Sequence, residues 1–195
     1  MTDDITNAVQ AAAAEKIRRR LRNKALHYLE RYSSTEAKLA DILQRFAMRK
    51  ITGYSASEVA PHIHHIVSQC VTLGYIDDRA FAESKWQAGL RNGRSPQMLA
   101  QKLKHAGVND DIIQALRTQG AETADTELHA AIISARKRRI GPFAKTPPAD
   151  YAEFQKQMAR LVRAGFSLSV ARTVMNFETG EAAEEVLHGK SSVYP

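Results

Sequence analysis

The chain has 195 residues, 44% of them hydrophobic, so it can bury a core, and its composition excludes wholesale disorder. Its net charge of +7 and pI of about 9.6 favour polyanionic surroundings or partners, although charge alone does not identify a nucleic-acid reader. The single cysteine excludes an internal disulfide framework, and no apolar run reaches the roughly 18 residues of a membrane helix. We therefore expect a cytoplasmic protein without membrane association.

The N-terminal part of the chain is read as a loose tail followed by a basic helix. Residues 1–14 form the expected tail, and helical spacing begins near Glu15. Ile17, Leu21 and Ala25 then recur at the period that places them on one helix face. Six basic residues fall within nine positions around that face, which suits contact with phosphates or an acidic protein groove as well as simple solvation. They are Lys16, Arg18, Arg19, Arg20, Arg22 and Lys24.

Two further helices are expected before residue 73. Ser33 and Glu36 have the spacing of a capping box, in which a hydroxyl and a carboxylate each bind the other residue's backbone N–H. The helix after that is expected to start near Glu58. Pro61 is tolerated only in a first turn, where its missing N–H is no loss, so this start moves toward Ala60.

Residues 73–116 read as three helices with clear boundaries. Glycine adopts the left-handed conformation of a helix stop cheaply, and Asp, Asn and Ser side chains accept the free N–H groups of a helix start. The boundary residues are Gly74, Asp77 with Asp78, Ser95 with Pro96, Gly107 and Asn109.

A last group of helices follows a similar plan. A helix over residues 124–139 ends in four consecutive basic residues, which complement the negative end of its dipole. A helix near residues 150–163 stops at Gly165, and Ser167 caps the next one. Residues 179–195 look frayed.

These helices form an internal repeat. Gly107, Asn109 and Leu103 match Gly165, Ser167 and Leu161 at an offset of 58, and Thr35 lies 60 residues before Ser95. We predict an all-α protein of three tandem three-helix repeats that stack into an elongated, curved array, because one such unit cannot bury enough surface alone. The alternative is a compact all-helical domain. The expected repeats cover residues 15–73, 74–120 and 121–178, between flexible tails at 1–14 and 179–195.

The sequence offers no set of residues that points to catalysis. Residues 89–93 lack the Lys-Ser/Thr end of a phosphate-binding loop. His62, His64 and His65 lack partners with metal-ligand spacing, so surface or half-buried histidines are expected. Cys70 lies on an apolar stripe and is expected in the core. We therefore predict a non-enzymatic protein with no metal and no cofactor.

Two residues of the central stretch, Trp86 and Arg94, each have two possible roles. Trp86, the only tryptophan, is expected to anchor packing rather than to form an exposed stacking platform. Arg94 stands at a tight turn before a helix start, and it either braces that turn through backbone carbonyls or projects toward a partner.

The central stretch resembles a known family. Its sequence Leu-Gly-Tyr-Ile-Asp-Asp-Arg-Ala-Phe-Ala at residues 73–82, then Gly-Arg-Ser at 93–95 and spaced leucines up to Gly107, is similar to the central repeat of the RecX family, bacterial regulators of the recombinase RecA. The resemblance is strong over residues 73–116 and colinear over roughly 24–177. It implies a protein that lodges in the groove of the RecA–single-stranded-DNA filament and blocks its extension or promotes its disassembly, which would suppress ATP hydrolysis, strand exchange and coprotease activity. The chain departs from the family pattern in two loops and both tails.

The candidate partner-binding residues are the exposed-looking basic clusters, and we expect a monomer that presents them to RecA, with at most weak contact to DNA. The alternative is a basic helical module that binds DNA directly, tightly without RecA and with a steep salt dependence. A helical scaffold for another partner would show neither behaviour. The candidates are Arg18, Arg19, Arg20, Arg22, Arg91, Arg94, Lys102, Lys104, Arg136, Lys137, Arg138 and Arg139.

Overall fold

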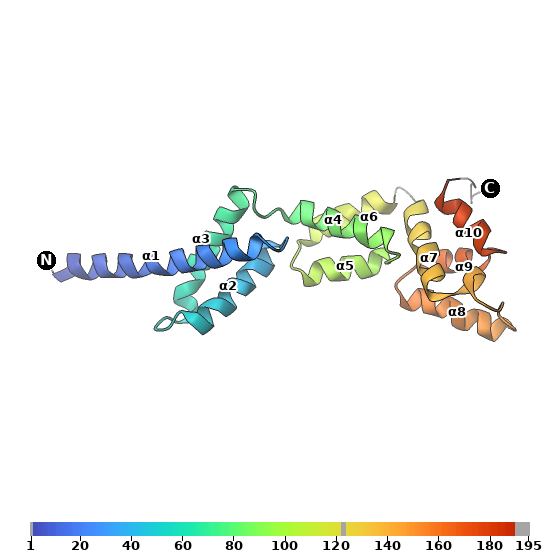
Figure 1. The fold of residues 1–195 in the computed structure, drawn as a ribbon, viewed down its shortest axis with the longest axis horizontal. Helices are drawn as coiled ribbons and strands as arrows, with labels where there is room; N and C mark the ends of the chain where they lie inside the picture. The colour runs from blue at the N-terminus through green and yellow to red at the C-terminus, as the bar shows by residue number, and fades with distance from the viewer. Residues whose placement is uncertain (1, 122–123, 190–195) are drawn as a thin grey trace. The chain divides into compact units, whose positions relative to one another are not determined.

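A computed structural model describes residues 2–121 and 124–189 (Figure 1). These residues form ten α-helices and one short 3-10 helix, with no β-strand among them, so the all-α prediction is confirmed. They divide into two compact units: the first runs to Phe81 and includes Ala106–Val108, and the second holds Ala82–His105 and the chain from Asn109 onward. The helices are α1 (Thr2–Leu29), α2 (Glu36–Lys50), α3 (Ala56–Thr72), α4 (Asp78–Arg91), α5 (Pro96–His105), α6 (Asp110–Ala121), α7 (Ala124–Arg138), the 3-10 helix η1 (Gly141–Phe143), α8 (Tyr151–Arg163), α9 (Leu168–Met175) and α10 (Gly180–Leu187).

The first unit is built by α1, α2 and α3, which pack against one another (Figure 1). Leucines at a spacing of four put Leu39 and Leu43 on one face of α2, where both are fully buried. They meet the predicted stripe of α1, of which Leu21 and Ala25 are fully buried too. Ile17 of α1 and Ala47 of α2 belong to the same core, and its other members come from α3 and its flanks: Ile51, Val59, Ile63, Ile66, Val67, Cys70 and Ile76.

Both predicted tails contain helix where the sequence predicted loose or frayed chain. Helix α1 begins at Thr2, where a loose tail was expected over residues 1–14. The alanine run at residues 11–14 has the highest helix propensity of any residue type, so it extends the helix rather than ending it. Helix α10 likewise occupies part of the expected frayed end, and Thr179 caps it by accepting the Ala182 N–H at 3.1 Å. The exact division into three repeats stays a prediction.

Two helix starts in the first unit differ from the prediction. The residue that caps α2 is Thr35, not Ser33, and its hydroxyl accepts the Lys38 N–H at 3.1 Å. The capping box lies instead at the start of α3, where Glu58 accepts the Ser55 N–H at 2.7 Å and Ser55 accepts the Glu58 N–H at 3.3 Å.

The helix α3 therefore starts earlier than Pro61 suggested. Since α3 begins at Ala56, the proline lies in its second turn, and the expectation of a start near Ala60 was wrong. A proline inside a helix costs about 3 kcal/mol. The buried stripe of α3, which includes Val59, Ile63 and Ile66, offsets that cost because each such side chain contributes about 1.5–3 kcal/mol on burial.

The second unit confirms most of the predicted boundaries of its helices. Asn109 caps α6 by accepting the Asp111 N–H at 2.9 Å, and Ser167 caps α9 by accepting the Val170 N–H at 3.3 Å. Trp86 on α4 is 2% exposed, so it is a packing anchor as expected. Close by, the absence of a side chain at Gly89 lets α4 approach Leu99 of α5. In the same unit α7 packs against α9 and α10, and α8 against α9 (Figure 1).

One contact occurs twice and supports the internal repeat. The Thr35 hydroxyl, besides capping α2, donates to the carbonyl of Ala106. The Ser95 hydroxyl caps α5 by accepting the Met98 N–H at 3.3 Å and donates to the carbonyl of Ala164 at 2.6 Å. Both hydroxyls belong to fully buried residues. We call this arrangement the cap joint; the first joint lies within the first unit and the second within the second.

The glycine that follows each accepting carbonyl is part of the cap joint. Gly107 and Gly165 have φ angles of +81° and +89°, which side chains rarely adopt. A Cβ atom at Gly107 would overlap Ala37, and one at Gly165 would lie 2.6 Å from Ser95 Oγ. The glycines thus serve two purposes, since they end a helix and let another helix start against the turn.

Candidate partner-binding surface

Two of the four candidate arginines on α1 are engaged within the protein. Arg18 is half-buried and pairs with Glu15 at 3.1 Å. Arg20 donates to the backbone carbonyl of Lys50 at 2.6 Å, at the C-terminus of α2, where a cation complements the helix dipole. Both side chains therefore have a structural role in the first unit.

The other two arginines of α1 face solvent. Arg19 and Arg22 are exposed, and neither side chain has a partner among the described residues. A spacing of three places them together on the helix, on the side away from the buried Ile17 and Leu21. They are the part of this cluster that is free to meet a partner.

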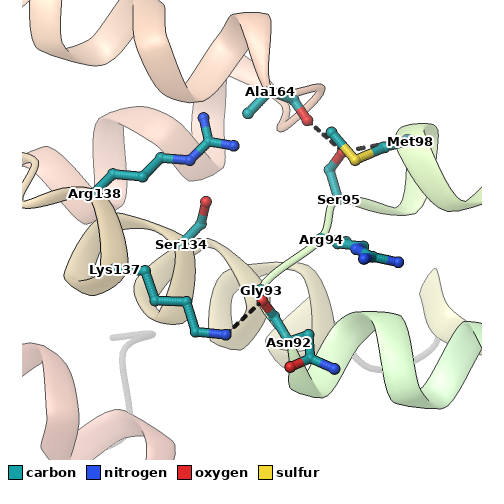
Figure 2. A pocket seen from close by; sticks show the side chains of 9 residues that line it. All are labelled: Asn92, Gly93, Arg94, Ser95, Met98, Ser134, Lys137, Arg138 and Ala164. Carbon is teal, nitrogen blue, oxygen red and sulfur yellow. Dashed lines mark hydrogen bonds between the residues drawn. The ribbon is translucent and has the colours of Figure 1, made fainter.

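The candidates on α4 and α5 are exposed, and one is paired. Lys104 forms an ion pair with Asp110 at 3.0 Å, while Arg91 and Lys102 have no partner among the described residues. The Arg94 side chain makes no hydrogen bond to the described residues either, so it projects rather than braces the turn (Figure 2).

The basic end of α7 is exposed throughout, and half of it is engaged. Arg136 pairs with Glu184 of α10 at 3.1 Å, and Lys137 donates to the carbonyl of Asn92 at 3.0 Å. The second contact neutralises the C-terminal end of α4. The two candidates whose side chains have no partner among the described residues are Arg138 and Arg139.

A cavity of about 220 Å³ in the second unit brings two of the predicted clusters together (Figure 2). It joins Arg94 of the α4–α5 turn to Lys137 and Arg138 of α7, residues more than forty positions apart in the sequence. Two buried serines, Ser95 and Ser134, complete its polar wall. The remaining lining residues are Asn92, Gly93, Met98 and Ala164.

Sequence reasoning missed Ser134, which is only 2% exposed. The available signal was a lone polar residue inside the apolar run of residues 130–135, directly before the basic cluster. The sequence analysis also did not predict the close contact between Gly93 and α7. It approaches α7 so closely that a Cβ atom there would lie 2.8 Å from the Ser134 backbone nitrogen. The other candidate cations do not line this cavity.

Two titratable groups outside this cavity have pKa values shifted by burial, and both lie in the first unit. Burial raises the pKa of the Cys70 thiol, which lies in the core of the first unit as expected. Burial also raises the pKa of Asp78, although the Glu36 N–H that it accepts at 3.0 Å works in the opposite direction. Among the described residues, no group of three or more His, Cys, Asp or Glu side chains could hold a metal ion.

Comparison with known proteins assigns the chain to a family. A family model described as the second three-helix domain of RecX matches residues 77–116. The regulatory protein RecX of Myxococcus xanthus is 35% identical over 158 residues, which cover 80% of this chain and 84% of that protein. The regulatory protein RecX of Agrobacterium fabrum is 35% identical over 182 residues, 91% of this chain and 95% of that protein. The chain belongs to the RecX family.

Solved structures give the RecX-family fold independently of sequence. The crystal structure of RecX from Lactobacillus salivarius aligns with a TM-score of 0.63 at 20% identity and covers 83% of this chain and 96% of that one. A second crystal structure of regulatory protein RecX aligns with a TM-score of 0.67 at 22% identity, over 88% and 78% of the two chains. In the part of this RecX-family chain that the structure describes, no helix is both long and apolar enough to cross a membrane.

Proposed function

We propose that this RecX-family chain binds the RecA–single-stranded-DNA filament and negatively modulates RecA, acting by binding and not by catalysis. The observation that carries the proposal is its 35% identity to regulatory RecX proteins over most of both chains. The exposed cations support it further, since a filament that contains DNA is polyanionic. The protein is proposed to act as a monomer in the cytoplasm.

The mechanism follows from where the free cations lie. Arg19 and Arg22 stand exposed on the first unit, and Arg138 and Arg139 on the second. A protein with a cationic patch on each of two units can hold a polymer at two points, so each contact raises the effective concentration of the other. Lodged in the filament groove, it would oppose the addition of RecA subunits or favour their loss, and ATP hydrolysis, strand exchange and coprotease activity would fall together.

The proposal is tested by the DNA-dependent ATPase of RecA on single-stranded DNA, with this protein added at substoichiometric amounts. We expect the steady-state rate to fall well before one molecule is present per RecA subunit, because one bound molecule affects the filament beyond it. A rate that stays unchanged at equimolar protein would refute the proposal.

A matched pair of variants tests the role of the α1 surface. Arg19→Gln with Arg22→Gln removes two unpaired charges, and we expect it to raise the concentration needed for half-inhibition. The control, Arg45→Gln with Arg49→Gln, removes the same charge from α2, where Arg45 pairs with Asp41 at 2.6 Å and Arg49 donates to the Arg45 carbonyl at 3.1 Å. Equal effects of the two pairs would mean that only net charge matters.

Direct DNA binding is the competing function, favoured by the same unpaired arginines. It predicts tight binding to naked DNA without RecA, with an affinity that falls steeply as salt rises. A filament regulator predicts weak binding to naked DNA at physiological salt together with strong ATPase inhibition, so the two measurements on one preparation separate the functions.

A further inference from the structure

The cavity beside α7 has a polar wall in which two backbone acceptors are already used. The Asn92 carbonyl receives the Lys137 ammonium, and the Ala164 carbonyl receives the Ser95 hydroxyl at 2.6 Å (Figure 2). No carboxylate lines the cavity. Apart from the Asn92 side-chain oxygen, what the side chains of the wall offer a ligand is therefore mainly donors, from Arg94, Lys137, Arg138 and Ser134.

Two donors face this cavity without a partner among the described residues. The Ser134 side chain is buried, and its hydroxyl points into the space enclosed by the lining residues (Figure 2). The Arg138 guanidinium reaches toward the same space from the next turn of α7 (Figure 2). No side-chain oxygen or nitrogen is both buried and without a hydrogen-bond partner among the described residues, so the Ser134 hydroxyl is reached from the cavity and is available to donate to a ligand there.

The charge of the lining limits the class of that ligand. Arg138 and Lys137 both carry a positive charge, and the Lys137 ammonium keeps donors beyond the one given to Asn92. Arg94 adds a third cation at the rim. A cation would be repelled and an apolar group would leave the donors unsatisfied, whereas a tetrahedral oxyanion accepts from a guanidinium, an ammonium and a hydroxyl together. The volume of about 220 Å³ exceeds the roughly 30 Å³ share of one water several-fold.

Arg136, Lys137 and Arg138 lie in the last turn of α7 and complement its dipole, but this effect does not use the N–H donors of the Arg138 guanidinium. Lys137 caps the end of α4 through Asn92. At the end of α8 the Ala164 carbonyl is already bound by Ser95, and no hydrogen bond joins the Arg138 side chain to the described residues. The guanidinium is left for a ligand.

We propose that this cavity is a phosphate-binding site, in which Arg138 and Lys137 hold the oxyanion and the Ser134 hydroxyl donates to it. The phosphate belongs either to a nucleic-acid backbone or to a free phosphate compound such as a nucleotide. Phosphate binding in this cavity goes beyond the proposed regulation of the RecA filament. It is tested without RecA, so failure of the phosphate proposal would leave the filament proposal standing, and the reverse.

The test compares three variants of the full chain with three probes. Arg138→Gln removes the guanidinium, Ser134→Ala removes the unpaired hydroxyl, and Arg172→Gln is the control because it removes the same charge from an exposed residue of α9 outside the cavity. The probes are a fluorescein-labelled oligothymidylate followed by anisotropy, and ATP and inorganic phosphate followed by titration calorimetry. Thermal unfolding of each variant shows that it is folded, and Ser134→Ala removes no hydrogen bond to a described residue.

We expect Arg138→Gln to weaken binding of the relevant probe roughly tenfold and Ser134→Ala roughly threefold, the usual effects of losing one charged and one neutral hydrogen bond. Arg172→Gln is expected to change it less than about twofold. If the oligothymidylate responds in this way, the phosphate is that of a nucleic acid, and Arg138→Gln also reduces its salt slope by about 0.7. If only ATP or inorganic phosphate responds, the site takes a free phosphate compound. If Arg138→Gln matches Arg172→Gln and Ser134→Ala matches wild type for all three probes, the proposal is overturned.

Discussion

Replacing Ser95 with alanine removes two hydrogen bonds at once from the cap joint of the second unit. The hydroxyl accepts the Met98 N–H at 3.3 Å and donates to the Ala164 carbonyl at 2.6 Å, and the residue is fully buried. The variant therefore leaves one backbone donor and one backbone acceptor without these partners, and it creates no large void because only one atom is lost.

The expected cost can be estimated from its two parts. Loss of a helix cap costs about 1 kcal/mol. A buried carbonyl without a partner costs about 1–3 kcal/mol, and the lower end applies to Ala164 because the adjoining cavity admits water to it. We expect Ser95→Ala to lower the free energy of unfolding by about 2 kcal/mol, which at a typical urea slope of about 2 kcal/mol/M moves the unfolding midpoint down by about 1 M.

Urea unfolding followed by Trp86 fluorescence measures this change, since the only tryptophan is buried in the second unit. The control is Ser95→Thr, which keeps the hydroxyl; the chain itself uses a threonine in the equivalent joint, at Thr35. A midpoint shift below about 0.25 M for Ser95→Ala, or an equal loss in Ser95→Thr, would show that the hydroxyl does not hold the joint.

Two other predictions concern backbone conformation and pH. Gly165→Ala should lower the free energy of unfolding by at least about 2 kcal/mol, because its new Cβ would lie 2.6 Å from Ser95 Oγ in addition to the strain of a left-handed backbone. Gly53→Ala is the control: it has a φ of +87° and no atom within 4 Å, so it should lose only about 1 kcal/mol. Equal losses of the two variants in urea unfolding would argue against the close approach at Gly165. The Ser55 N–H and hydroxyl lower the pKa of Glu58 below its usual 4.5, so ionised Glu58 contributes stability above pH 4.5 that is lost as the pH falls through the lowered pKa. Unfolding midpoints of wild type and Glu58→Gln should therefore differ more at pH 7 than near pH 3, and a pH-independent difference would contradict this.

The helix boundaries were predictable wherever one side chain and its own backbone decide them. Asp77 accepts the Ala80 N–H at 2.9 Å, and Asn109 and Ser167 cap their helices as their positions suggested. The all-α class followed from these caps and from the spacing of apolar residues, since both are local properties of the sequence.

Boundaries that depend on distant residues could not be predicted in the same way. Residues 33–35 are three consecutive hydroxyl side chains, each able to cap a helix. The structure uses Thr35, whose hydroxyl also reaches Ala106, a residue 71 positions away. Pro61 is a similar case, because the gain that outweighs its cost comes from burial of α3 against α1 and α2.

The candidate surface was predictable only in part for the same reason. Exposure of the basic clusters was expected from their composition, and all of residues 136–139 are indeed exposed. Which of them are engaged depends on partners such as Glu184 and Asn92, which lie 48 and 45 positions away. The cavity itself draws its wall from the α4–α5 turn, α7 and the end of α8, and no local spacing links these segments.

Because Cys70 is buried in the first unit and Trp86 in the second, each unit carries its own probe of unfolding. The chain has one thiol and one indole, the thiol in the core of the first unit and the indole in that of the second. A thiol reagent can modify Cys70 only when the first unit opens, so its labelling rate in rising urea reports that opening in the wild-type chain. Set beside the fluorescence transition on one urea axis, labelling reveals whether the two halves melt together or one after the other.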